Sequence, residues 1–153
     1  MSTTADTSPA ETTSIRPATL ADAESVFGLL QQLAMTYTPN REAFDRAFPQ
    51  LVREDSESLI LVATDAAGKV RGYALTTISP LLHTNGSSAQ LQELVVDDEV
   101  RGTGIGTRLV ESVEAACRER HVMQLLVPSR RSADFYERLG YRSTADLLKR
   151  TFD

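Results

Sequence analysis

The segment LQELVVDDEVRGTGIGTRLV, residues 91–110, decides how this chain folds. Its first half ends in an apolar, strand-like run at Val95 and Val96, and from residue 107 onward the pattern is helical. Between the two lie three alternate glycines, in RGTGIG at 101–106. Glycine lets the backbone approach a ligand closely, and the free N–H groups at the start of a helix attract anions. The segment therefore predicts a strand-to-helix turn that suits phosphate or pyrophosphate.

Two common phosphate-binding motifs do not fit this turn. A dinucleotide fingerprint needs a further glycine at position 107 or 109, where the chain has Thr107 and Leu109. A Walker loop needs Gly-Lys-Ser/Thr, and no lysine lies in the segment. The remaining alternative is a tight turn without a ligand, but one glycine would suffice for such a turn.

Residues 101–106 resemble the acyl-CoA signature of the GNAT superfamily of N-acetyltransferases, Arg/Gln-x-x-Gly-x-Gly/Ala. The likeness extends to LQELVVD at 91–97, which resembles the fourth strand of that fold, and to ADFYERLGY at 133–141, which resembles its closing helix. It covers residues 89–142 through these motifs and 14–79 through the order of elements. The resemblance implies an α/β fold with a central mixed β-sheet flanked by about four helices. It also implies acetyl-CoA as the acyl donor and an amine as the acceptor.

The remaining sequence predicts the other elements of such a fold. A capping-box pattern at Thr19 and Asp22 begins an amphipathic helix over 19–33. A second helical stretch runs from Pro39 to Val52, and Pro49 should kink or divide it. The helix after the glycine turn carries a buried stripe, and a later helix is closed by a glycine. The expected ranges are strands at 59–63, 70–78, 89–96, 124–127 and 147–152, a loop over 80–88, a stripe of Ile105, Leu109, Val113 and Cys117, and a helix over 132–139 before Gly140.

The composition is that of one soluble domain, with 153 residues, 41% apolar and 24% charged. No apolar run approaches the roughly 18 to 20 residues of a membrane span, and the first 14 residues lack the features of a signal peptide. The net charge of −5 argues against nucleic acid as a partner. A lone cysteine with two histidines leaves no structural zinc set. We expect a disordered tail over 1–13, a single domain over 14–153, a cytoplasmic location, no metal and no membrane partner.

The resemblance implies which residues bind acetyl-CoA. In this family the fourth and fifth strands separate, the pantetheine arm lies between them, and the glycine turn holds the pyrophosphate. A serine stands seven residues before the candidate tyrosine, where the family often has an asparagine that contacts the cofactor, and its hydroxyl can replace part of that contact. Three acids at 97–99 lie just upstream, and we expect them to face solvent. The implied donor-binding residues are Leu94, Val95, Val96, Arg101, Gly102, Thr103, Gly104, Ile105, Gly106, Thr107 and Ser129.

Glu93 is the candidate general base. Alternation along the predicted strand places it on the same face as Leu91 and Val95. Apolar surroundings of this kind make a carboxylate a better base near neutral pH. In the family that the chain resembles, a glutamate here commonly deprotonates the acceptor ammonium, often through a water. The alternative is a surface carboxylate without a catalytic role.

Tyr136 is the candidate general acid, because it matches the tyrosine that the family uses to protonate the sulfur of coenzyme A. An ordinary tyrosine keeps its proton at neutral pH and can therefore act as an acid. The alternative is a core tyrosine whose hydroxyl is satisfied within the fold. Cys117 is interpreted as helix packing and not as a nucleophile.

Tyr37 and His83 are candidate acceptor contacts, since one lies between the first two helical stretches and the other in the loop before the fourth strand. The sequence predicts an N-acetyltransferase in which a primary amine attacks acetyl-CoA directly. A small-molecule amine is favoured, because residues 91–96 and the short C-terminal end resemble small-molecule enzymes of the family such as aminoalkylphosphonate acetyltransferases. The alternatives are a peptide or protein acceptor, or a non-catalytic acyl-CoA-binding regulatory module. A homodimer is possible, because dimers are common in the family.

Overall fold

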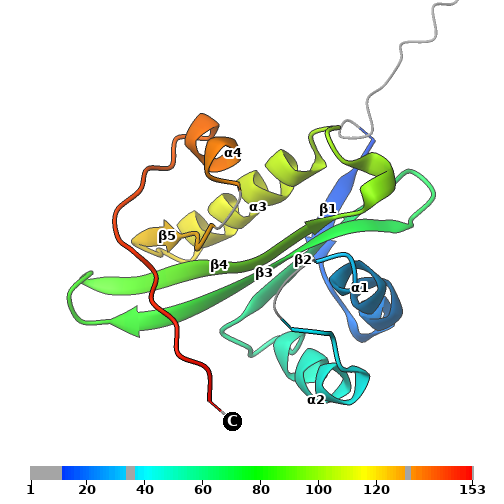
Figure 1. Ribbon diagram of the computed structural model, residues 1–153, viewed down its shortest axis with the longest axis horizontal. Coiled ribbons are helices and arrows are strands. Elements are labelled where there is room, and N and C mark those ends of the chain that lie inside the picture. Colours follow the sequence, from blue (N-terminus) through cyan, green and yellow to red (C-terminus); the bar gives the residue numbers. More distant parts are fainter. Residues whose placement is uncertain (1–11, 34–36, 130–131, 153) are drawn as a thin grey trace, which may run out of the picture.

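A computed structural model describes residues 12–33, 37–129 and 132–152 of the chain (Figure 1). The described residues form a mixed sheet of five strands in the order β1-β2-β3-β4-β5, antiparallel except for the parallel pair β4 and β5. The helices α1 and α2 cover one face of the sheet, and α3 and α4 cover the other (Figure 1). This arrangement confirms the predicted fold class. The strands are β1 Ser14–Pro17, β2 Leu59–Thr64, β3 Val70–Leu81, β4 Gly86–Val96 and β5 Gln124–Leu126; the helices are α1 Ala23–Leu30, α2 Arg41–Leu51, α3 Ile105–Glu119 and α4 Ala133–Arg138, with short 3₁₀ turns η1 Leu20–Asp22 and η2 Asp98–Val100.

Each face of the sheet has its own apolar core. On one face the predicted stripe of α3 is buried against β2, β3 and β4, and Leu109 and Val113 are fully inaccessible to solvent. On the other face Val26 of α1 and Phe48 of α2 pack with Val62 and Tyr73 of the sheet. Burial of these side chains is what holds the helices in place, because non-polar contact area is the main favourable term in folding.

The strands β3 and β4 form a hairpin that is longer than predicted. The expected loop over 80–88 is wrong: β3 continues to Leu81 and β4 starts at Gly86, so that Pro80 pairs with Ser87. The pairing of β2 with β3 stops at Thr76. Pro80 therefore lies where β3 is an edge strand, and a missing N–H group is tolerated there.

A β-bulge in this hairpin changes which way Glu93 faces. Leu75 pairs with Glu93 and Thr76 pairs with Leu91, so that Gln92 is an extra residue on β4. Leu91 lies in the core under α3, whereas Val95 lies in the core under α1 and α2. The predicted shared face of Leu91, Glu93 and Val95 is thus wrong for Leu91, because one extra residue reverses the alternation.

Several helix and strand ends differ from the sequence pattern. The helix expected over 19–33 starts as a 3₁₀ turn and ends at Leu30, and α2 continues through Pro49 without restarting. The strand β1 at Ser14–Pro17 was not predicted. Gly140, with φ 96°, closes α4 as expected. The predicted disordered tail lies mostly outside the described residues, although Thr13 at its end is buried.

The strand expected over 147–152 is wrong. Residues 142–152 contain no regular structure, and the side chains of Leu147, Leu148 and Phe152 are 75%, 91% and 85% exposed. An extended segment forms a strand only when a neighbouring strand accepts its backbone hydrogen bonds. In the described part of the chain, no helix is long and apolar enough to cross a membrane.

Candidate active site

The glycine turn has the backbone shape that its sequence predicts. Gly102 and Gly104 have φ of 76° and 93°, in the left-handed region that other residues rarely adopt. Gly104 is the N-cap of α3, and its carbonyl oxygen accepts the hydrogen bond of Arg108 N at 3.1 Å. The first N–H groups of α3 have no acceptor within the helix, and its first turn contains no acidic residue. The turn is therefore suited to bind an anion.

The acids upstream of the turn are paired with arginines. Asp97 is buried and lies 3.2 Å from Nη1 of Arg71, which also contacts Glu99 at 3.3 Å. The expectation that all three acids face solvent is thus wrong for Asp97. Asp98 and Arg101 form an exposed ion pair at 2.6 Å. Because exposed ion pairs contribute little, a phosphate can compete with Asp98 for Arg101.

The pairing of β4 with β5 ends before the glycine turn, and the unpaired stretch of β4 beyond it is called here the opening between β4 and β5. The two strands pair only at Ser88–Gln90 with Gln124–Leu126. From Leu91 to Val96, the edge of β4 that faces away from β3 has no strand partner among the described residues. Unpaired N–H and C=O groups of a strand can accept an extended ligand as a further strand.

Glu93 faces α1 and α2 at this opening. Its side chain is half-buried, and Oε1 accepts a hydrogen bond of 2.6 Å from the hydroxyl of Tyr73. Tyr73 is 2% exposed and lies in the core on the same face. Burial, together with the neighbouring Glu93, raises the pKa of Tyr73 far above its ordinary value. Tyr73 therefore stays protonated and acts as a donor to the carboxylate.

Tyr136 lies on α4, on the opposite face from Glu93. It is 8% exposed and packs edge-on against Phe135 and Tyr141, with ring centroids 5.0 Å and 5.7 Å away. Burial raises the pKa of its hydroxyl to about 12. Phe135 also lies beside the turn, because a Cβ atom added to Gly106 would be 3.6 Å from its ring. The helix α4 therefore carries both the candidate acid, Tyr136, and a residue that lies beside the glycine turn, Phe135.

The other predicted contacts are less close to this centre. Ser129 is exposed, and its hydroxyl accepts a hydrogen bond from Ser132 N at 3.2 Å, ahead of α4. Tyr37 is 62% exposed between α1 and α2, with Nζ of Lys149 5.0 Å above its ring. His83 is exposed at the tip of the β3–β4 hairpin, roughly 20 Å or more along β4 from Glu93. The structure does not bring His83 and Glu93 together.

Sequence analysis missed Arg71 and Tyr73. Both lie on β3, and their partners Asp97 and Glu93 lie on β4 or directly after it. Only the register of the two strands brings them together, and no motif in the sequence marks that register. The nearest signal is the presence of a charged and an aromatic polar side chain among the otherwise non-polar residues 70–75 at the start of β3.

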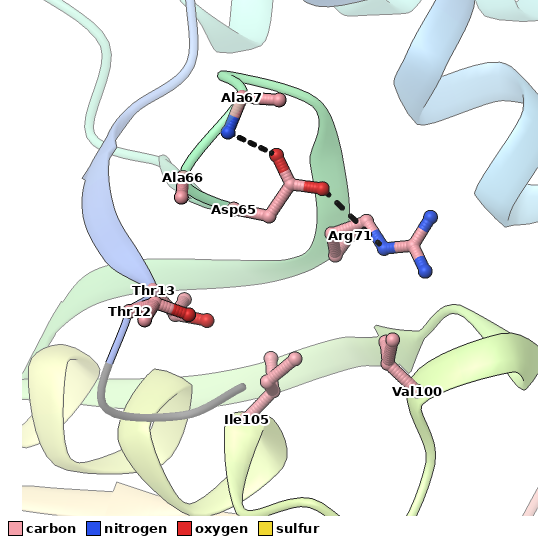
Figure 2. Close-up of a pocket in the computed structure, with 8 residues that line it drawn as sticks. All are labelled: Thr12, Thr13, Asp65, Ala66, Ala67, Arg71, Val100 and Ile105. Carbon is pink, nitrogen blue, oxygen red and sulfur yellow. Dashed lines mark hydrogen bonds and ion pairs between the residues drawn. The ribbon is translucent and has the colours of Figure 1, made fainter. Parts of the chain in front are cut away.

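A pocket of about 380 Å³ lies at the other side of the turn (Figure 2). Val100, Ile105 and Arg71 line it, together with the β2–β3 turn and residues just before β1. Because β1 and β5 are at opposite edges of the sheet, this pocket is separate from the opening between β4 and β5. Among the described residues, no group of histidine, cysteine and acidic side chains could hold a metal ion.

Known proteins resemble this chain over most of its length. Residues 27–141 match the profile of the acetyltransferase (GNAT) family. Glucosamine 6-phosphate N-acetyltransferase 1 of Oryza sativa subsp. japonica is 30% identical over 131 residues, covering 83% of this chain and 79% of the relative. Glucosamine 6-phosphate N-acetyltransferase of Arabidopsis thaliana is 26% identical over 148 residues, covering 94% and 99%.

Solved structures of known proteins also resemble this chain over most of its length. The crystal structure of glucosamine-6-phosphate N-acetyltransferase from Arabidopsis thaliana has a TM-score of 0.81 at 25% identity and covers 94% of this chain and 100% of its own. A structure described as a transcriptional regulator from Bacillus halodurans C-125 also has a TM-score of 0.81 at 25% identity, covering 92% and 99%.

Proposed function

Because this chain belongs to the GNAT family of acetyltransferases and is an acyltransferase, we propose that it acetylates the primary amine of a small molecule, with acetyl-CoA as the donor. The observation that carries the proposal is the opening between β4 and β5, which has an anion-binding turn at one end and a carboxylate beside it. Its curated relatives are named for acetylation of glucosamine 6-phosphate, so this amino sugar phosphate is the first acceptor to test.

The donor site is proposed to be built mainly from main-chain groups. The unpaired edge of β4 at Leu94–Val96 would pair with the pantetheine arm, and the turn from Arg101 to Thr107 would hold the pyrophosphate. Gly102 and Gly104 allow close approach, since neither has a side chain to cover the N–H groups. Ser129 would contribute a side-chain contact just before α4.

The proposed reaction uses the two faces of the sheet. Glu93 accepts a proton from the acceptor ammonium, directly or through water, and the free amine attacks the thioester carbon. The nitrogen of the tetrahedral intermediate loses its second proton to solvent water, and the C–S bond breaks, which leaves the neutral amide and the thiolate of coenzyme A. Tyr136 donates its hydroxyl proton to that thiolate from the side of α4. Its raised pKa keeps the proton in place at neutral pH.

Thiol release from acetyl-CoA tests this function. Wild-type protein is mixed with acetyl-CoA and glucosamine 6-phosphate, glucosamine, an aminoalkylphosphonate or a set of peptides with free N-termini. We expect release of the thiol with a small amine, and faster release with glucosamine 6-phosphate than with glucosamine. Turnover with peptides alone would contradict a small-molecule acceptor and support the peptide alternative. Acetyl-CoA binding without turnover on any amine would support a regulatory module.

A homodimer is also proposed, because the C-terminal segment, residues 142–152, and the outer edge of β5 both lack a strand partner among the described residues. The outer edge of β5 lies beside a groove of about 290 Å³ that Gln124, Leu125 and Gly140 help to line. The segment leaves α4 and reaches Tyr37, so it runs away from this groove (Figure 1). In a two-fold dimer, residues 142–152 of each copy, which form no strand within one copy, can add to the β5 edge of the other.

Light scattering after size-exclusion chromatography tests the dimer. A dimer is expected for the wild-type chain, and Leu148→Glu should make it a monomer, because the leucine is 91% exposed within one copy. Leu20→Glu is the matched control, since Leu20 is 63% exposed beside β1 at the opposite edge of the sheet. A monomeric wild-type protein, or equal dissociation of both variants, would contradict this interface.

A further inference from the structure

The hydrogen bond between Tyr73 and Glu93 crosses two strands of the sheet. Tyr73 pairs with Val95, and Glu93 is two residues further back along β4, so the two side chains are diagonal neighbours on one face. The hydroxyl of Tyr73 lies 2.6 Å from Oε1 of Glu93. This length is typical of a hydroxyl that donates to an ionised carboxylate.

The β-bulge makes this bond possible. Without Gln92 as the extra residue, uninterrupted alternation from Leu91 would direct Glu93 towards the face that α3 covers. With the bulge, Glu93 lies on the face of Tyr73, Val95 and the helices α1 and α2. The register of β3 and β4 therefore determines that the carboxylate of Glu93 lies next to the ring of Tyr73.

The ring of Tyr73 cannot move away from this position easily. It is 2% exposed and packs in the core that contains Val26, Leu29 and Phe48 from α1 and α2. Close-packed interiors hold side chains in single rotamers. The hydroxyl is therefore presented to Glu93 by a rigid surrounding, and the position of the carboxylate depends on the packing of both helices.

Within the described residues, each group has the other as its hydrogen-bond partner. The hydroxyl of Tyr73 makes no second hydrogen bond among them, and no other described side chain forms a hydrogen bond or ion pair with the carboxylate of Glu93. One carboxylate oxygen is thus fixed by the tyrosine, and Oε2 remains for a further partner. A carboxylate held at one oxygen has fewer orientations to lose when the substrate arrives.

We propose that Tyr73 is a positioning residue that holds the Glu93 carboxylate so that Oε2 faces the ammonium group of the acceptor. This inference rests on the proposed function, in which Glu93 is the base. Tyr73 touches neither acetyl-CoA nor the acceptor and acts through Glu93. The substitution Tyr73→Phe keeps the ring in the core and removes only the hydroxyl.

The expected effect of Tyr73→Phe is on turnover and not on donor binding. The kcat should fall about 10-fold, because the freed carboxylate samples unproductive orientations. The KM for acetyl-CoA should stay unchanged, since the donor turn lies on the opposite face. Incorporation of 4-aminophenylalanine at position 73 returns a donor to the same place and should restore much of the loss. If 4-aminophenylalanine at position 73 restores kcat, the core around this position also tolerates the substitution.

A double-variant cycle separates positioning from a general structural role. In the background of Glu93→Gln, Tyr73→Phe should have little further effect on kcat, because there is no base left to position. Equal losses in both backgrounds would overturn the inference. If Glu93→Gln alone had no effect, the proposed function would fail instead. If Glu93→Gln lowered kcat and Tyr73→Phe did not, the base would stand and the positioning role would fail.

Tyr141→Phe is the matched control. Tyr141 donates a hydrogen bond of the same length, 2.6 Å, to Glu114 of α3, away from Glu93. Both substitutions remove one tyrosine hydroxyl from one carboxylate. We expect Tyr141→Phe to change the melting temperature by a similar amount, with kcat within about 2-fold of the wild type. A 10-fold loss of kcat in the control as well would overturn the specific role of Tyr73.

Discussion

The two faces of the sheet contribute different kinds of groups to the proposed reaction. On the face of α3, the glycine turn has main-chain N–H groups that would bind the donor. On the face of α1 and α2, the proposed base is a carboxylate that accepts a hydrogen bond from a buried tyrosine. The first site depends on backbone shape and the second on the register of two strands. A backbone site leaves a motif in the sequence, whereas a site set by register does not.

The largest expected effect comes from the backbone of the donor site. Gly104→Val places a branched side chain at a residue with φ 93° and covers N–H groups of α3. Acetyl-CoA affinity should fall about 100-fold or more, since several charge-assisted hydrogen bonds are lost. Isothermal titration calorimetry measures the effect.

Gly68→Val is the control for backbone strain. Gly68 has φ 84° in the β2–β3 turn, and open space surrounds the place of its Cβ. Both variants should lose about 1–3 kcal/mol of stability, but Gly68→Val should bind acetyl-CoA normally. Unchanged affinity in a folded Gly104→Val protein would contradict the donor site.

On the acceptor face, Glu93→Gln keeps the shape of the side chain and removes the base. The rate near neutral pH should fall roughly 10- to 1000-fold. The loss should shrink at high pH, where the amine is already unprotonated. Rate measurements from pH 6 to about 10 check this. A loss that does not change with pH would assign Glu93 a binding role, and no loss would remove it from the mechanism.

Tyr136→Phe tests the contribution of α4 to the donor face. The kcat should fall about 100-fold, while acetyl-CoA affinity survives because the ring stays in the core. The pKa of Tyr136 is raised to about 12, so its proton remains bound through the ordinary assay range. Wild-type kcat should therefore show no decline that Tyr136 causes below about pH 10. A variant that matches the wild type in kcat would make Tyr136 a core residue.

The smallest effect on activity is expected at the start of α1. Asp22 is buried, and its bidentate hydrogen bonds with Arg16, both 2.8 Å long, hold its pKa below the ordinary carboxyl value. The stabilisation is complete above the ordinary pKa of a carboxyl group and is lost as the pH falls through the lowered value. Asp22→Asn should cost about 1–2 kcal/mol at pH 7, with kcat nearly unchanged.

Denaturant unfolding at several pH values measures this. The difference between wild type and Asp22→Asn should shrink as the pH falls below the ordinary pKa of a carboxyl group and through the lowered pKa of Asp22, because the wild-type carboxyl then becomes protonated too. A difference that stays constant through acid pH would show that the charge of Asp22 does not stabilise the fold.

The parts of the fold that sequence predicts well are those with local causes. The stripe of Ile105, Leu109, Val113 and Cys117 is buried as expected, because helical spacing alone places these residues on one face. The end of α4 at Gly140 also has a local cause, because a glycine in the left-handed conformation ends a helix without help from distant residues.

The parts that sequence does not predict depend on distant partners. The face of Glu93 changes with one extra residue opposite Leu75 and Thr76, and alternation along a single strand cannot show that residue. The predicted strand at 147–152 has the right composition, but no neighbouring strand pairs with it within the described chain. Asp97 was expected in solvent, and Arg71 on β3 provides the charge that allows its burial.

Acetyl-CoA titration into Glu93→Gln, with thiol release measured on the same sample, tests the division between the two faces most directly. If main-chain groups on the α3 face bind the donor and Glu93 acts only on the acceptor, the Kd for acetyl-CoA will equal that of the wild type while turnover on glucosamine 6-phosphate falls at least 10-fold. A Kd that weakens as much as turnover falls would contradict this account, because Glu93 would then belong to the donor site.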